Sequence, residues 1–283
     1  MKNIGLFGIS IPTEYGGSNL SMEQEVELTF ELGRASPAFR SMAGTNIGIG
    51  SQTIVMSGTD EQKSKYLPDL IKGNLIGCFG LTESEAGSDP SSMKTHFKEV
   101  SDGYIINGSK NWITNAPIAD IFIIWAINNE KNIQGFIIEK NTAGLSTSVI
   151  QNKASLKISP TGQIILNDVK VPKKNILPNT QGWKSVYSSL NKARYGIAWG
   201  VMGAAESSWL IAKEYTENRI MFKKKLAATQ LIQKKLADMQ TEISIGLSAC
   251  LHTGRAMDNN KDMKIAISML KRNNCHKALK IVR

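Results

Sequence analysis

The sequence is poor in the residues that build disulfide frameworks and metal sites. Only 3 of its 283 residues are cysteines and only 3 are histidines. Cys78, Cys250 and Cys275 lie far apart and form no Cys-x-x-Cys pair, and no two histidines have the HExxH spacing of a zinc site. We therefore expect neither a disulfide scaffold nor a metal site, and we expect a reducing compartment.

Long apolar runs are missing as well. The longest strongly apolar run covers residues 121–127, far short of the roughly 20 residues that span a bilayer, so no membrane span is expected. The first twenty residues lack the charged start, apolar stretch and cleavage site of a secretory signal. These features favour the cytoplasm, with the mitochondrial matrix as the alternative if a missing N-terminal segment held a transit peptide.

The composition is otherwise that of a globular protein, but its charge is uneven. Hydrophobic residues make up 41% of the chain, and the formal net charge is +10. Residues 1–178 carry a net charge of −1 and residues 179–283 carry +11. A basic helical segment can bind nucleic acid, and basic runs lie at 223–225, 234–235 and 271–272. These runs sit between core-facing stripes and no base-stacking aromatics are interleaved with them, so we expect no nucleic acid partner.

Periodicity divides the chain into three segments, which we interpret as domains. Residues 1–74 have helical spacing, with capping boxes at Ser21 with Gln24 and at Thr59 with Gln62. Residues 75–178 alternate short β-rich runs with turn residues, and residues 179–283 return to long helical stripes. The β-rich runs are 75–81, 104–107, 121–127, 134–138 and 163–166.

The predicted fold class is a multidomain α+β protein. It has an N-terminal α-helical domain, a middle antiparallel β-barrel or sandwich domain, and an incomplete C-terminal helical bundle. The sheet is predicted to be antiparallel because no long helix interrupts the β-rich runs. No GxGxxG follows a strand, which disfavours a nicotinamide site.

Two polar stretches are candidates for chemistry. Residues 80–92 read GLTESEAGSDPSS, a loop of small residues and hydroxyls that can wrap a polar ligand closely or can be only a turn. Residues 111–117 read NWITNAP and set an indole beside a hydroxyl and two amides. Such an indole suits a flat heteroaromatic ring, although alone it is more often a core tryptophan beside a turn.

These stretches resemble the two flavin-contacting signatures of the acyl-CoA dehydrogenases. The resemblance is greatest to the glutaryl-CoA dehydrogenases, through the stretches at 79–83, 88–93, 191–200, 230–239 and 270–275, and it covers nearly the whole chain. It implies an FAD-containing homotetrameric flavoprotein, an oxidoreductase of fatty acid or amino acid catabolism. The implied reaction is oxidative decarboxylation of glutaryl-CoA to crotonyl-CoA, and the implied electron acceptor is an electron-transfer flavoprotein. The alternative is an inactive truncated remnant that still binds flavin or other subunits.

The same resemblance implies roles for individual residues. Thr82 and Ser88 would hydrogen-bond the flavin and its phosphate arm, Trp112 would stack near the isoalloxazine, and Thr114 would face N5 and the substrate. The other implied cofactor residues are Phe79, Leu81, Gly87 and Ile113, together with Arg219, Phe222 and Gln230, which would reach the FAD of a neighbouring subunit.

For the substrate, the resemblance implies that Arg40 and Ser41 grip the far carboxylate of glutarate. Ser88 and Thr114 are the other implied substrate-binding residues. A buried anion requires such a cationic partner, although a helix-surface arginine is the plain alternative. Arg194 resembles the family's arginine beside the catalytic base.

The resemblance also implies that some family features are absent from this sequence. The family's catalytic Glu would lie beyond Arg283, so no catalytic base is expected in this chain, and the first N-terminal helices are expected to be missing too. Lys223 stands where the family usually has Gly after Phe222, which alters a turn.

Overall fold

The computed structural model describes residues 2–283, which form two compact units. One unit contains residues 2–20 and Ser41–Lys192, and the other contains Ser21–Arg40 and Ala193–Arg283. The chain therefore passes between the units three times.

The first seventy residues are helical, as the spacing predicts. The helices are α1 (Met22–Ala35), α2 (Pro37–Gly44), a π-helical segment (Thr45–Ser51), α3 (Gln52–Ser57) and α4 (Asp60–Lys72). Both predicted capping boxes are confirmed: the Ser21 side chain accepts from the Gln24 amide, and the Thr59 side chain accepts from the Gln62 amide. These caps satisfy backbone donors that would otherwise lack partners, so the start of each helix is fixed locally.

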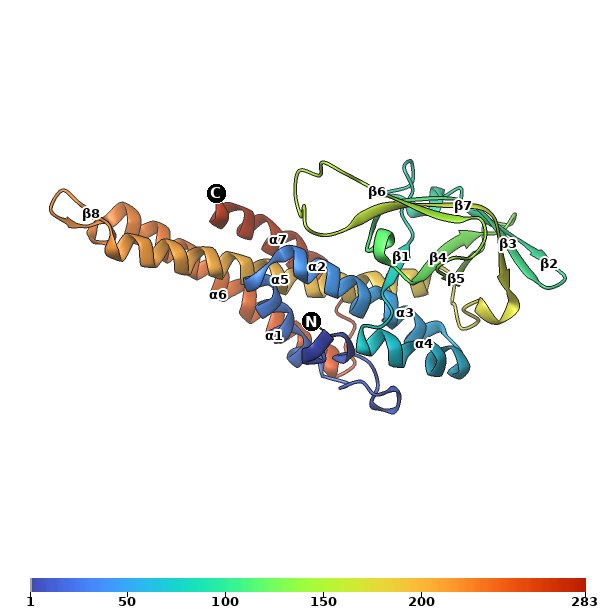
Figure 1. Ribbon diagram of the computed structural model, residues 1–283. Helices are drawn as coiled ribbons and strands as arrows, with labels where there is room; N and C mark the ends of the chain where they lie inside the picture. Colours follow the sequence, from blue (N-terminus) through green and yellow to red (C-terminus); the bar gives the residue numbers. More distant parts are fainter. Residues whose placement is uncertain (1) are drawn as a thin grey trace. The chain divides into compact units, whose positions relative to one another are not determined.

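The first unit contains a curled sheet of seven strands (Figure 1). The order is β1-β4-β2-β3-β7-β6, and β5 also pairs with β4. The strands are β1 (Gly77–Gly80), β2 (His96–Val100), β3 (Gly103–Thr114), β4 (Ile121–Ile127), β5 (Ile133–Glu139), β6 (Leu145–Val149) and β7 (Thr161–Pro172). The predicted α+β class with a central β-domain is confirmed.

One feature of the sheet departs from the predicted antiparallel arrangement. β1 runs parallel to β4, with Gly77 opposite Ile121, and β2 meets β4 in a single parallel pairing. All other pairs are antiparallel. A parallel pair needs a long crossover, and here the β2–β3 hairpin supplies it where a helix is the usual solution.

The apolar run at 121–127 forms a strand that is buried on both faces. Ile121, Ile123 and Trp125 belong to one core cluster, and Phe122 and Ile124 belong to another. Alternate side chains of a strand point to opposite faces, so a strand covered on both sides needs an unbroken apolar sequence.

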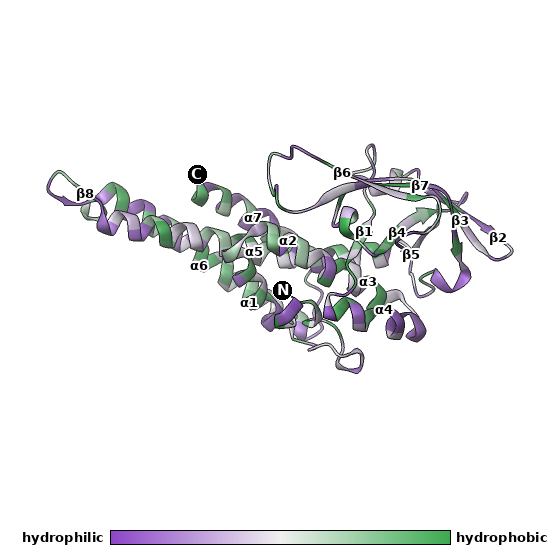
Figure 2. Cartoon of the chain, in the orientation of Figure 1, coloured by the Kyte–Doolittle hydropathy of each residue, from purple (hydrophilic) through white to green (hydrophobic). Residues whose placement is uncertain are grey.

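The second unit is a bundle of long helices. Together with α1 it contains α5 (Trp183–Asn218), which begins in the first unit, then the hairpin β8 (Ile220–Met221) and β9 (Lys224–Lys225), α6 (Gln230–Asp258) and α7 (Lys264–Val282). Hydrophilic and hydrophobic turns alternate along α5 and α6 (Figure 2). The other helical pieces are short 3-10 turns at Lys2–Ile4, Leu6–Gly8, Thr13–Tyr15, Pro90–Ser92, Ala116–Ile118, Lys173–Asn175 and Leu226–Ala228.

Glycines allow α1 and α5 to approach closely. A Cβ placed on Gly33 would lie 2.0 Å from the carbonyl oxygen of Gly200, and one on Gly203 would lie 2.1 Å from that of Phe30. No side chain fits at either position, so the backbones of the two helices are in direct contact.

Candidate functional site

A cavity of about 170 Å³ in the first unit gathers residues from four separate segments. The segments are the π-helical segment, the end of β1, the end of β3 and the beginning of α5. The lining residues are Thr45, Ile49, Phe79, Leu81, Thr82, Trp112, Ile113, Thr114 and Leu190. Six of these nine are among the predicted cofactor residues, so the fold brings the two flavin-like signatures together.

An irregularity in β3 presents Trp112 at this cavity. The register between β3 and β7 shifts between Lys110 and Ile113, and Trp112 has a φ of +59°, a left-handed conformation that is rare for a bulky side chain. Trp112 is 57% exposed, whereas Ile113 beside it is buried. The strand thus holds a flat apolar ring at the rim of the cavity, where a planar ligand would cover it.

The loop after β1 continues away from the cavity. Gly80 ends the strand where a Cβ would lie 2.6 Å from Ile124 Cδ1, so a larger residue there would require the Ile124 side chain to move. Farther along, Gly87 and Ser88 lie on the exposed part of the loop and do not line the cavity. The cavity is too small to enclose a dinucleotide, so the remainder of such a ligand would extend over exposed surface.

A buried ion pair between Lys110 and Glu83 contacts the beginning of this loop. Lys110 is fully buried, and its Nζ donates to the carbonyl oxygen of Leu81 at 3.1 Å and to Glu83 Oε1 at 2.9 Å. Burial lowers the pKa of Lys110 to about 8, although the charge of Glu83 opposes this effect. Burial alone would raise the pKa of Glu83, but Lys110 and the amides of Lys94 and Thr95 hold it below its ordinary value.

The sequence interpretation missed Lys110 and Glu83. Glu83 lies within the first signature, and Lys110 directly precedes the second. Their opposite charges are the one feature of the sequence that could have suggested a pair. It also missed Thr45, Ile49 and Leu190, which line the cavity from helices with no distinctive motif.

The side-chain amides of two buried asparagines hydrogen-bond to the backbone near the cavity. Asn46 Oδ1 accepts from the Gly77 amide at 2.6 Å, and Asn115 Nδ2 donates to the carbonyl oxygen of Met42 at 3.0 Å. Asn115 has a φ of +69°, a conformation that asparagine tolerates better than most residues. Asn46 thus links the π-helical segment to the start of β1, and Asn115 links the turn after β3 to α2.

Arg40 lies within the second unit, against α5. Its Nη2 donates to the carbonyl oxygen of Ala193 at 3.5 Å, its Nε is buried without a hydrogen-bond partner among the described residues, and burial lowers its pKa to about 10. A Cβ on Gly196 would lie 2.7 Å from Nη2, so glycine makes room for the guanidinium. The group stays cationic at neutral pH, in a place where an anionic ligand would interact strongly.

The other predicted residues do not line the cavity. Ser41 follows Arg40 on α2 and belongs to the first unit, where its carbonyl oxygen accepts from Thr45 Oγ1 at 3.0 Å. Arg194 is half-buried on α5. Arg219, Phe222 and Gln230 are exposed around the β8–β9 hairpin, and the Phe222 side chain is 90% exposed.

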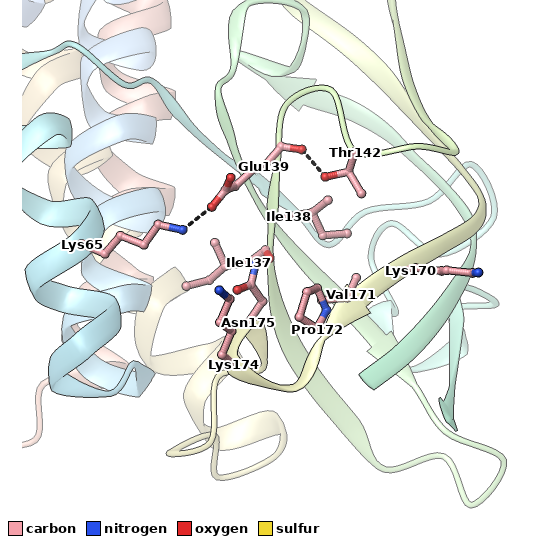
Figure 3. A pocket seen from close by; sticks show the side chains of 10 residues that line it. All are labelled: Lys65, Ile137, Ile138, Glu139, Thr142, Lys170, Val171, Pro172, Lys174 and Asn175. Carbon is pink, nitrogen blue, oxygen red and sulfur yellow. Dashed lines mark hydrogen bonds and ion pairs between the residues drawn. The ribbon is translucent and has the colours of Figure 1, made fainter. Parts of the chain in front are cut away.

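A larger hollow of about 320 Å³ lies elsewhere on the first unit, between α4 and the ends of β5 and β7 (Figure 3). Lys65 Nζ lies 2.6 Å from Glu139 Oε1, and the Tyr66 hydroxyl donates to the same oxygen at 2.7 Å. The hydrogen bond from Lys65, followed by that from Tyr66, lowers the pKa of Glu139. These groups satisfy one another, and no predicted site residue lines this hollow.

Comparison with known proteins identifies the family. Three family models match: the N-terminal domain of acyl-CoA dehydrogenase at residues 1–74, its middle domain at 78–169 and its C-terminal domain at 180–283. An acyl-CoA dehydrogenase of Bacillus subtilis is 34% identical over 275 residues, which are 94% of this chain and 73% of the relative. The chain belongs to the acyl-CoA dehydrogenase family. Its fold is the one that the sequence resemblance implied.

Other members of the acyl-CoA dehydrogenase family are similar at the same level. The mitochondrial 2-methylacyl-CoA dehydrogenase of Solanum tuberosum is 36% identical over 92% of this chain, which spans 65% of that relative's length. Glutaryl-CoA dehydrogenase of Mycobacterium smegmatis has a TM-score of 0.96 at 35% identity, over 99% of this chain and 72% of its own. A structure of a glutaryl-CoA dehydrogenase from the same organism, in complex with FADH2, has the same values. Within the described residues, no helix of this chain is long and apolar enough to cross a bilayer.

Proposed function

We propose that this chain is an FAD-dependent oxidoreductase that acts on glutaryl-CoA and yields crotonyl-CoA by oxidative decarboxylation. The observation that carries the proposal is the single cavity lined by six residues of the two flavin-like signatures. Its similarity to a glutaryl-CoA dehydrogenase whose structure holds FADH2 supports both the cofactor and the substrate class.

The cavity suits a flat heteroaromatic ring. The indole of Trp112 is exposed at its rim, Phe79 and Leu81 supply apolar walls, and Thr82 and Thr114 supply hydroxyls. In this proposal Thr82 and Ser88 hydrogen-bond the cofactor, Trp112 packs against its ring, and Thr114 lies beside the reacting edge. FAD, when bound, supplies the acceptor for the hydride removed from the substrate.

The specificity for a dicarboxylic acyl chain rests on Arg40. Its buried guanidinium has an unpartnered Nε and forms no ion pair with a carboxylate in the described chain. We propose that Arg40 and Ser41 hold the far carboxylate of glutarate, where a monocarboxylic acyl chain would leave the cation without a partner.

The remaining roles follow from the family resemblance. Arg219, Phe222 and Gln230 would contact the FAD of a neighbouring subunit in a homotetramer, and Arg194 would correspond to the arginine that other members have beside the catalytic base. An electron-transfer flavoprotein is the proposed acceptor of the electrons.

A second candidate function is flavin binding without dehydrogenation. None of the nine residues that line the cavity is a carboxylate, and Glu83 nearby is already bonded to Lys110 and to two amides. Removal of the proton α to the thioester needs a general base within reach. Residues that line this cavity do not supply it.

An anaerobic titration distinguishes the two functions. The purified chain, saturated with FAD, is titrated with glutaryl-CoA and, in parallel, with butyryl-CoA, while the visible absorbance of the flavin is followed. Bleaching by glutaryl-CoA at lower concentration than by butyryl-CoA supports the dehydrogenase proposal. Bound flavin that neither thioester bleaches supports the second function, and failure to bind FAD contradicts both.

A further inference from the structure

The ammonium group of Lys110 has an unusual position for a lysine. It lies in the sheet with no exposed side-chain surface, although burying a charge is unfavourable unless good partners compensate. An apolar side chain of similar length would fill the same space without this cost. The partners of Lys110 therefore indicate what the charge does there.

These partners all belong to the segment between β1 and β2. Nζ reaches the Leu81 carbonyl oxygen and Glu83 Oε1 at the beginning of the loop, and it lies 3.8 Å from Met93 Sδ at the end. The carboxylate of Glu83 in turn accepts from the amide of Lys94 at 2.7 Å and from that of Thr95 at 2.9 Å. The ion pair thus fastens both ends of the loop to each other and to β3.

The bond to Leu81 also fixes the direction of a backbone donor. In a trans peptide the carbonyl and the following N–H point in opposite directions, and the described chain has no cis peptide. Because the Leu81 carbonyl points inward to Lys110, the Thr82 N–H points away from Lys110. No partner for that N–H exists among the described residues, and both Leu81 and Thr82 line the cavity.

The pair also sets the loop against the second signature. Lys110 lies two residues before Trp112 on β3, and the Asn111 amide between them donates to the Thr82 carbonyl oxygen at 2.8 Å. The two signatures are therefore joined at the point where the ion pair is buried.

We propose that Lys110 and Glu83 are positioning residues that hold the Leu81–Thr82 peptide so that the Thr82 N–H is presented to the flavin. This inference rests on the proposed FAD binding. Neither side chain touches the cofactor in this arrangement. They would affect flavin binding only by fixing the orientation of the Leu81–Thr82 peptide.

The charges around Lys110 are few. Glu83 faces it from the loop, and Lys94 interacts with Glu83 but directs its own ammonium outward to Glu85 at 2.6 Å. Deprotonation of Lys110 weakens its bonds to both Leu81 and Glu83. Flavin affinity should therefore fall as the pH rises through the pKa of Lys110, at about 8.

The test compares Lys110→Met with Lys94→Met, which removes an exposed ammonium from the same loop. FAD dissociation constants are measured by flavin fluorescence at several pH values, and hydrogen exchange of the Lys94 and Thr95 amides is measured without ligand. We expect Lys110→Met to raise the dissociation constant about tenfold or more and to accelerate exchange, while Lys94→Met changes the constant by less than about twofold. Only the variants that retain Lys110 should lose affinity above about pH 8.

Several results would overturn the inference. If Lys110→Met binds FAD as the wild type does, or keeps the same pH profile, the pair does not position the flavin. If Lys110→Met does not fold, Glu83→Gln is compared with Glu85→Gln in the same assays, with the same expected difference. If the wild type binds no FAD, the proposed function itself fails, whereas wild-type binding with unaltered variants contradicts this inference alone.

Discussion

Arg40 illustrates how a residue can be unfavourable for the fold and useful for a ligand. Its guanidinium is buried beside Gly196 with one nitrogen unpartnered. Replacing a buried ionic group by an apolar side chain is often neutral or stabilising. The buried guanidinium therefore fits a role in ligand binding and not a role in stability.

This contrast gives the first prediction. Arg40→Met should leave the free energy of unfolding unchanged or raise it by about 1 kcal/mol, while it weakens glutaryl-CoA binding about tenfold or more. FAD binding should not change. Urea unfolding and thioester titration check the two effects, and the matched variant Arg34→Met, at an arginine of the second unit that is paired with Glu206, should leave thioester binding intact. A destabilised Arg40→Met protein with normal thioester affinity would contradict the proposed role.

Lys110 gives a prediction about pH. Its pKa is lowered from 10.5 to about 8 in the folded chain, so between these values the unfolded chain binds more protons than the folded chain. The free energy of unfolding should therefore rise with pH over this range, by about 3 kcal/mol from this residue. Urea unfolding of the wild type and of Lys110→Met at matched pH values measures the difference, and equal slopes would refute it. Flavin affinity is expected to move in the opposite direction.

Six of the residues that the sequence resemblance assigned to the cofactor line one cavity, but neither member of the buried ion pair was predicted. Trp112 and Thr82 belong to signatures that can be recognised locally. No neighbouring residue in the sequence indicates that Lys110 is buried. Its environment consists of Leu81, Glu83 and Met93, which approach it only in the folded sheet.

At the scale of elements, the β8–β9 hairpin contains local strain. Its turn residues Phe222 and Lys223 have φ values of +50° and +62°, as in the type I′ turns that favour Asn-Gly. Lysine is poorly suited to this conformation, in line with the expectation that the family's glycine there is altered.

Lys223→Gly should therefore stabilise the hairpin by about 1 kcal/mol. The check is slower hydrogen exchange in the Ile220–Lys225 pair. Lys224→Gly is the control, since Lys224 lies in β9 outside the left-handed region, and this change should accelerate exchange. If both variants act alike, the strain at Lys223 is not significant.

The elements that the sequence predicted well are those with local signals. The capping boxes at Ser21 and Thr59 and the apolar run of β4 gave correct helix starts and a correct strand. β2 and β6 were missed because they are short and largely exposed, so they show no clear apolar alternation. The parallel pairing of β1 with β4 depends on contacts between distant segments, which no local pattern encodes.

For the whole molecule, the proposed cofactor should contribute to stability. A ligand that binds only the folded state stabilises it by about 2.7 kcal/mol at a hundred times its dissociation constant. Thermal unfolding should therefore shift upward with FAD concentration, and the shift should be smaller for Lys110→Met at equal FAD. A midpoint that is independent of FAD would contradict flavin binding by the folded chain.

The packing of α1 has a consequence for how the chain folds during synthesis. Glu23 on α1 pairs with Arg255, which lies 232 residues later, and the apolar face of α1 with Val26 packs in the same core as Cys250. At ribosomal speeds this partner emerges roughly 10–50 s after α1. The capping box lets α1 form early, but its apolar face stays uncovered until α5 with Tyr195 and Trp199 emerges, and it is completed only by α6. The nascent chain is thus a candidate for chaperone binding at α1. This exposure lasts through the synthesis of β1 to β7, which lie between α1 and α5 in the sequence.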